Sequence, residues 1–136
     1  MPKTQAWGRK ARYGYFSGKA PQVREKNESA VFISKIALLE NEFGGAKLAK
    51  IAGVDRSRIS RWKRGAKADS TNQERINGLE YVVTRLRGFL APGSEMKWLY
   101  GINAHLGNCR PIDLIERGRV AEVIAAVEQT ELGSYA

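Results

Sequence analysis

The stretch "AKLAKIAGVDRSRISRWKRG", residues 46–65, decides how this chain can fold. Leu48 and Ile51 form a short apolar repeat that ends at Gly53, and a glycine can adopt the left-handed backbone conformation that stops a helix. Asp55 then stands where its side chain can accept hydrogen bonds from the first amides of a second helix. The stretch therefore predicts two short helices joined by a tight turn.

The second helix has one apolar face, formed by Ile59 and Trp62, and its other faces are cationic. Val54 is an apolar peg between the two helices, and Ala49 suits a tight contact. These are the parts of a helix-turn-helix, in which the second helix rests on the core while its opposite side enters the major groove of DNA. The alternative is a basic helix on a solvated surface. Trp62 is expected in the core, with a stacking platform as its alternative.

The first turn of a recognition helix points at base edges, and this predicts that Arg56, Ser57 and Arg58 lie nearest the bases, followed one turn later by Arg61. Arginine can grip guanine with two hydrogen bonds, and serine can donate or accept. A second set of cations is expected to hold backbone phosphates, which position a protein without conveying sequence: Lys63, Arg64 and Lys67.

The net charge of +9 is unevenly distributed along the chain. Residues 1–28 carry seven Lys/Arg against two Glu, and residues 29–93 carry twelve cations against six acids. Residues 94–136 reverse the sign, with four cations against six acids. This asymmetry indicates that residues 1–93 face a polyanion and that residues 94–136 have a different role. The alternative is that the charge serves only solubility.

The remaining segments predict an all-α fold, because helical periodicity recurs and strand signals are absent. One helix is expected at 29–43, capped by Ser29. A longer helix is expected after a capping box formed by Thr71 and Glu74, and Gly78 and Gly88 within it allow a kink or an early end. A further helix is expected with Ser94 as its cap, and two later helices are expected to begin at Pro111 and after Gly118.

This pattern divides the chain into three parts. Residues 1–28 form a basic arm whose glycines leave no regular period, residues 29–93 form the helix-turn-helix domain with a long linking helix, and residues 94–136 form a small helical domain. The arm interleaves cations with Trp7, Tyr13, Tyr15 and Phe16. Either it binds nucleic acid, with aromatics for stacking or groove insertion, or its aromatics fold back onto the body.

Several function classes are not expected from the composition. The single Cys109 rules out an internal disulfide framework, and with the single His105 it leaves no zinc set. We find no nucleophile with its base and no phosphate-binding loop, so the chain is expected to be a binding protein without a cofactor, and not an enzyme. It has no signal peptide and no apolar run of membrane-spanning length, so a cytoplasmic location is expected.

Two segments resemble known families. "LAKIAGVDRSRISRWKRG" resembles the Xre/Cro-type helix-turn-helix of bacterial and phage repressors, over about residues 29–68. That resemblance implies an operator-binding protein that acts as a dimer on a two-fold site.

The segment "WLYGINAHLGNCRPIDLIERGRVAEVIAAV", residues 98–127, resembles the toxin-binding domain of the Xre/MbcA/ParS antitoxin family. The positions that match the family pattern keep their internal spacing: Trp98-Leu99, Asn103, Ala104, Leu106-Gly107, Arg110 to Ile115, and Gly118. The basic arm is not part of either motif.

The second resemblance implies a type II antitoxin that represses its own operon and blocks a RES-domain toxin, an NAD⁺-consuming protein, by covering its pocket. It assigns toxin binding to Trp98, Asn103, Arg110, Pro111, Asp113 and Tyr135. Arg110 could instead form only a surface salt bridge, and Tyr135 could be an unused terminus. For the whole chain, the alternative is a dimeric Xre/Cro-type repressor whose C-terminal region only dimerises.

Overall fold

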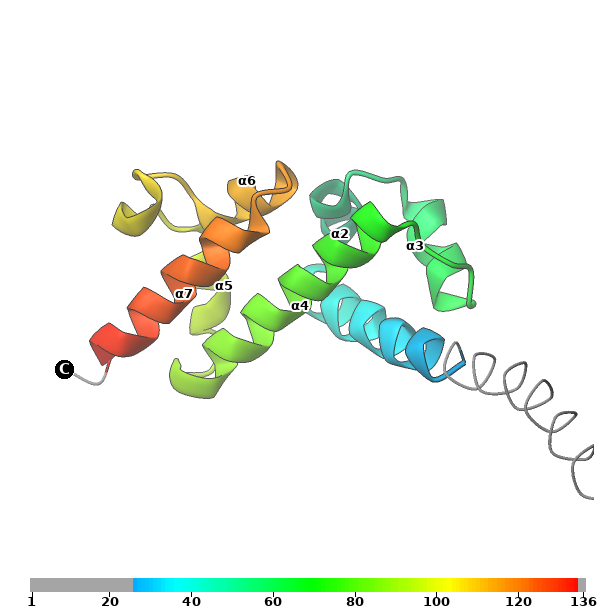
Figure 1. Ribbon diagram of the computed structural model, residues 1–136, viewed down its shortest axis with the longest axis horizontal. Helices are drawn as coiled ribbons and strands as arrows, with labels where there is room; N and C mark the ends of the chain where they lie inside the picture. Colours follow the sequence, from blue (N-terminus) through cyan, green and yellow to red (C-terminus); the bar gives the residue numbers. More distant parts are fainter. Residues whose placement is uncertain (1–25, 135–136) are drawn as a thin grey trace, which may run out of the picture.

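The computed structural model describes residues 26–134, and the regular structure in this range is helical (Figure 1). An N-terminal helix spans residues 26–43. It is followed by α2 (Gly45–Ala52), α3 (Arg56–Lys63), α4 (Ser70–Phe89), α5 (Ser94–Tyr100), the 3₁₀ helix η1 (Ala104–Leu106), α6 (Pro111–Glu116) and α7 (Val120–Ser134). The described residues form no strand, only an isolated β-bridge between Asn103 and Cys109. The predicted all-α fold is confirmed.

The N-terminal helix begins before the predicted residue. Residues 26–28 are already helical, so the expectation that Ser29 caps this helix was wrong, as was the irregular structure expected for those three residues. Lys26 and Glu28 are good helix formers, and no glycine or proline separates them from Ser29. Residues 1–25 of the predicted arm lie outside the described residues.

The turn between α2 and α3 forms as the sequence predicts. Gly53 has φ 72° and ψ 31°, the left-handed conformation that costs a residue with a Cβ about 1–2 kcal/mol. The next amide, on Val54, donates to the carbonyl oxygen of Ala49 at 3.0 Å, which closes the end of α2. Three residues, 53–55, therefore suffice to join α2 to α3.

The long helix α4 begins differently from the prediction. Its N-cap is Asp69, whose Oδ1 atom accepts from the amide of Asn72 at 3.1 Å, so the capping box expected from Thr71 and Glu74 was wrong. An aspartate is at least as good an N-cap as threonine, and it stands two residues earlier. From there α4 continues for 20 residues without the kink or early end that its two glycines would allow.

The C-terminal helices follow the predicted order with one correction. Ser94 is the first residue of α5 and not its cap, because Gly93, with φ 85°, takes the N-cap position without a side-chain hydrogen bond. Pro111 occupies the first turn of α6, and Gly118, with φ 80°, separates α6 from α7. Both of these predictions are confirmed.

Each of these helices except η1 contributes buried side chains to one hydrophobic cluster, and α7 lies along α4 (Figure 1). Its fully buried members come from both predicted domains: Ile36, Leu39, Leu48, Ile51, Ile59, Trp62, Ile76, Leu79, Val82, Val83, Leu86, Leu99, Ile112, Leu114, Ile115, Val123 and Val127. The predicted boundary between residues 93 and 94 is therefore not a break in packing, because the two parts share a core.

Candidate nucleic-acid interface and C-terminal surface

The start of α3 is fixed by Asp55. Its Oδ1 atom accepts from the amide of Arg58 at 2.9 Å and from the Ser57 hydroxyl at 2.7 Å. The hydrogen bond from Ser57 and then that from Arg58 lower the pKa of this exposed carboxyl below its ordinary value, and the charges of Arg61 and Arg58 act in the same direction. Asp55 thus stays ionised and holds the first turn of α3 in place.

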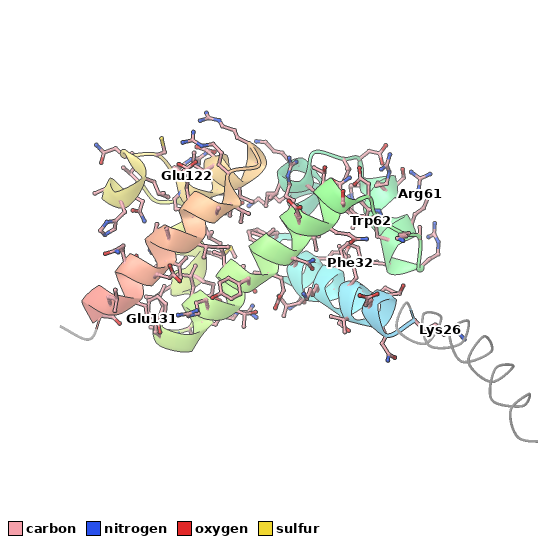
Figure 2. The ribbon with its side chains drawn as sticks, viewed as in Figure 1. Lys26, Phe32, Arg61, Trp62, Glu122 and Glu131 are labelled. Atoms are coloured by element: carbon pink, nitrogen blue, oxygen red, sulfur yellow. The ribbon has the colours of Figure 1, made fainter. Side chains whose placement is uncertain are left out.

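The inner face of α3 is anchored by Ile59 and Trp62, each only 1% exposed. The Trp62 ring meets that of Phe32 from the N-terminal helix edge to face, with centroids 6.0 Å apart and planes at 72° (Figure 2). Such a pair contributes about 0.5–1.5 kcal/mol beyond burial. Trp62 is therefore a core residue, as expected, and it fixes the rotation of α3.

The outer face of α3 carries exposed cations. Arg58, Arg61 and Arg64 have no ion-pair partner within residues 26–134, and the same holds for Lys67 in the loop that follows. Arg61 points away from the body of the molecule (Figure 2). These four side chains are exposed, and no ion pair within the described residues neutralises their charges.

The three other predicted DNA-binding residues have contacts inside the protein. Lys63 Nζ forms an ion pair with Glu40 Oε1 at 2.6 Å, and this partner lies 23 residues away in the sequence. The Arg56 guanidinium lies against Gly45. A Cβ atom added to Gly45 would be 3.1 Å from both Nε and Nη2 of Arg56. Ser57, through Asp55, also has an internal partner. An exposed ion pair contributes little, about 0–1 kcal/mol, so a phosphate could replace Glu40 at low cost.

Sequence reasoning missed the cations of α2. Lys47 and Lys50 are exposed, and neither has an ion-pair partner in the part of the chain that the structure describes. They stand three residues apart, hence as neighbours on one exposed side of the helix. That spacing was the signal that could have identified them.

At the other end of the molecule, Arg110 and Asp113 form a bidentate pair, with Nε to Oδ2 at 2.9 Å and Nη2 to Oδ1 at 2.8 Å. Hydrogen bonding from Arg110 lowers the pKa of Asp113 below its ordinary value, against the opposing effect of burial. The Arg110 guanidinium also lies 5.9 Å from the centre of the Tyr100 ring. Both members of the pair are partly exposed, so the pair could still meet a partner.

The other residues assigned to toxin binding mainly support the local structure. Trp98 Nε1 donates to Thr130 Oγ1 at 3.2 Å and thereby ties α5 to α7. The Asn103 side chain accepts from the amide of His105 at 2.9 Å and caps η1. Pro111 is buried. Tyr135 lies outside the described residues.

Two apolar side chains that the sequence analysis did not single out are exposed in this part of the molecule. Ile102, in the loop before η1, is 73% exposed, and Leu132, in the last turn of α7, is 65% exposed. In the N-terminal part, Val31 is 54% exposed. Single exposed apolar residues are common on protein surfaces, so these positions define candidates for contact and not an interface in themselves.

Comparison of the chain with protein-family models, curated proteins and solved structures gives no match. Between residues 26 and 134, no helix is both long and apolar enough to cross a membrane. The same residues contain no group of three or more His, Cys, Asp or Glu side chains that could hold a metal ion.

Proposed function

We propose that this chain is the antitoxin of a type II toxin–antitoxin system, with two binding surfaces on one helical body. The first binds operator DNA through α3 and represses the chain's own operon. The second, built from α5, η1, α6 and α7, binds a RES-domain toxin and blocks its access to NAD⁺. Both partners place the chain in a bacterial cytoplasm, as a dimer or a larger complex with the toxin.

The observation that carries the DNA-binding half is the two-sided character of α3. Its inner face is anchored by buried Trp62, and its outer face presents arginines without internal partners, among them Arg58 and Arg61. A recognition helix needs this combination, because it must be held rigidly while its exposed side reaches base edges. The N-cap bonds of Asp55 support the proposal further, because they fix the first turn, from which Arg56, Ser57 and Arg58 project.

Support for the antitoxin half comes from the sequence resemblance and from the exposed groups of the C-terminal part. Exposed Ile102 and Leu132 and the partly exposed pair of Arg110 and Asp113 are the groups available to a protein partner. The alternative of a tail that only dimerises through its valine-rich helix has less support. The apolar stripe of α7, with Val123 and Val127, is already buried inside the same chain.

The test uses the full chain, because removal of residues 94–136 would uncover the face of α4 on which α7 packs. The chain is co-expressed with the toxin encoded in the neighbouring reading frame, and cellular NAD⁺ is measured. We expect NAD⁺ to fall with the toxin alone and to be restored by the wild-type chain. The double variant Ile102→Asp/Leu132→Asp should restore less NAD⁺.

The control is Val31→Asp, which makes the same kind of substitution at one exposed apolar site of the N-terminal helix and should protect NAD⁺ as the wild type does. If the neighbouring protein alone leaves NAD⁺ unchanged, the antitoxin half of the proposal is wrong. The chain is then better described as a dimeric repressor.

A further inference from the structure

Two turns that are far apart in the sequence meet on a single arginine. Arg75 of α4 donates from Nη1 to the carbonyl oxygen of Ala52 at 2.9 Å, and the same atom would lie 2.9 Å from a Cβ on Gly53. Its Nη2 atom would lie 3.5 Å from a Cβ on Gly118. The turn between α6 and α7 is therefore adjacent to the turn between α2 and α3. Figure 1 shows the α6–α7 turn next to α2.

This arrangement brings a cation of the C-terminal part next to those of α2. Arg117 precedes Gly118 in the α6–α7 turn and is exposed, as are Lys47 and Lys50 on α2. None of the three has an ion-pair partner among residues 26–134. We call these three residues the flanking cations.

The acidic groups near the flanking cations leave this surface positive. Asp113 is held by Arg110, and Glu122 is held by Arg119 through two bonds of 2.6 and 2.7 Å. Glu116 is half-buried. After the hydrogen bonds of Arg110, the charges of Arg117 and Lys50 also lower the pKa of Asp113, so both lie within reach of the same carboxylate. Lys50 and Arg117 thus belong to one patch, and Lys47 stands one turn before Lys50 on the same side of α2.

The patch lies on the side of the molecule where α3 begins. The guanidinium of Arg56, the first residue of α3, contacts Gly45, the first residue of α2, so the two helices begin beside each other. When the second helix of a helix-turn-helix enters the major groove, the first crosses the sugar–phosphate backbone. Lys47 and Lys50 are the exposed cations of α2 available to such a backbone, and Arg117 stands in the α6–α7 turn beside this helix.

We propose that Lys47, Lys50 and Arg117 bind backbone phosphates of double-stranded DNA, so that the DNA-contacting surface includes the α6–α7 turn. This inference rests on the proposed DNA-binding function and extends it beyond the helix-turn-helix. The C-terminal part then has a direct share in DNA affinity. Contacts of this kind add affinity and fix register but convey no base sequence.

The salt dependence of binding tests the proposal, because each phosphate neutralised makes the plot of log K against log salt steeper by about 0.9. Binding to a fluorescein-labelled duplex of random sequence is followed by anisotropy between about 50 and 200 mM KCl. We expect Lys50→Gln and Arg117→Gln each to make the slope less negative by about 0.9, and Lys47→Gln/Lys50→Gln/Arg117→Gln by about 2.7. Thermal unfolding checks that the variants fold, as expected for exposed side chains.

The matched control is Gln129→Glu, which changes the net charge by the same amount as Arg117→Gln. Gln129 is exposed on α7, nine residues beyond the first residue of that helix, Val120, which corresponds to about 14 Å along the helix from the α6–α7 turn. The Debye length is about 10 Å at 100 mM salt and shorter above it, so the control should keep the wild-type slope over the upper part of the salt range.

The outcomes separate this inference from the proposed function. If the wild-type chain does not bind the duplex, or binds it without salt dependence, DNA binding itself is wrong. A second outcome is that the wild type has a steep salt slope, that Arg61→Gln makes this slope shallower, and that the triple variant leaves it unchanged. In that case the flanking cations do not contact phosphates. The inference is also overturned if Gln129→Glu alters the slope as much as Arg117→Gln, because the effect is then one of net charge.

Discussion

Gly78 of α4 lies directly against Val120 of α7: a Cβ atom on Gly78 would come within 2.7 Å of Val120 Cγ2 and 2.9 Å of Cγ1. Glycine inside a helix costs about 1 kcal/mol relative to alanine. At this position the absence of a side chain lets α7, from the C-terminal part, approach α4 closely. Gly88, on the same helix, has nothing within 4 Å of the corresponding position.

The first prediction concerns these two glycines. Gly78→Ala should lower the free energy of unfolding by about 1–3 kcal/mol, because the added methyl group forces Val120 and α7 away from α4. Gly88→Ala should raise it by about 0.5–1 kcal/mol, because only helix propensity changes. Urea denaturation followed by circular dichroism measures both. A Gly78→Ala protein as stable as Gly88→Ala would show that α7 does not pack at this distance.

The second prediction concerns the cap of α3. Asp55→Ala should lower the free energy of unfolding by about 0.5–2 kcal/mol, because the amide of Arg58 loses its acceptor. Asp55→Asn is the control, because asparagine caps a helix as well as aspartate and lacks only the charge. It should stay close to the wild type in denaturant titrations. Equal losses in both variants would mean that the charge, and not the cap, stabilises α3.

The third prediction separates base reading from phosphate binding. Arg58→Ala should weaken binding to a selected operator by about 1–3 kcal/mol and relax the preference at one base pair, because an arginine can bond two atoms of a guanine edge. Lys67→Ala should weaken binding to all sequences alike. Competition between operator and random duplexes provides the measurement. If Arg58→Ala reduces both affinities by the same factor, Arg58 contacts only phosphate.

The fourth prediction concerns pH and the buried carboxylate of Glu95. Glu95 is 5% exposed, and one oxygen accepts from Arg87 Nε at 3.1 Å, while Arg87 also pairs with Glu42. A hydrogen bond from its own backbone amide lowers the pKa of Glu95 below its ordinary value, burial acts in the opposite direction, and Arg87 lowers it further.

Because the folded-state pKa of Glu95 is the lower one, its contribution to stability is present above the unfolded-state value, about 4.3, and is lost as pH falls through the folded-state value. We expect Glu95→Gln to make the free energy of unfolding less dependent on pH between about 3 and 5. Guanidinium titrations at several pH values measure this slope. Exposed Glu128→Gln is the control, and a Glu95→Gln curve parallel to the wild type would contradict the prediction.

Local patterns predicted the helices α2 and α3 and the turn between them because each of these signals depends on near neighbours. A left-handed glycine at position 53, a cap at Asp55 and the apolar spacing of Ile59 and Trp62 act within a turn or two, and all are present in the structure. The cap of α4 was misassigned for the opposite reason. Asp69 and Thr71 are both acceptable N-caps two residues apart, and local sequence cannot rank them.

The sequence by itself determined that this protein is helical, where its helices lie to within a few residues, and which face of α3 is buried. Periodicity and capping depend on backbone geometry that each segment carries with it. Only the tertiary structure decided which cations keep free charges, that Lys63 pairs with Glu40, and that the α6–α7 turn reaches the α2–α3 turn through Arg75. These contacts join residues 23 or more positions apart, and their pairing is settled by how the helices pack around the shared core.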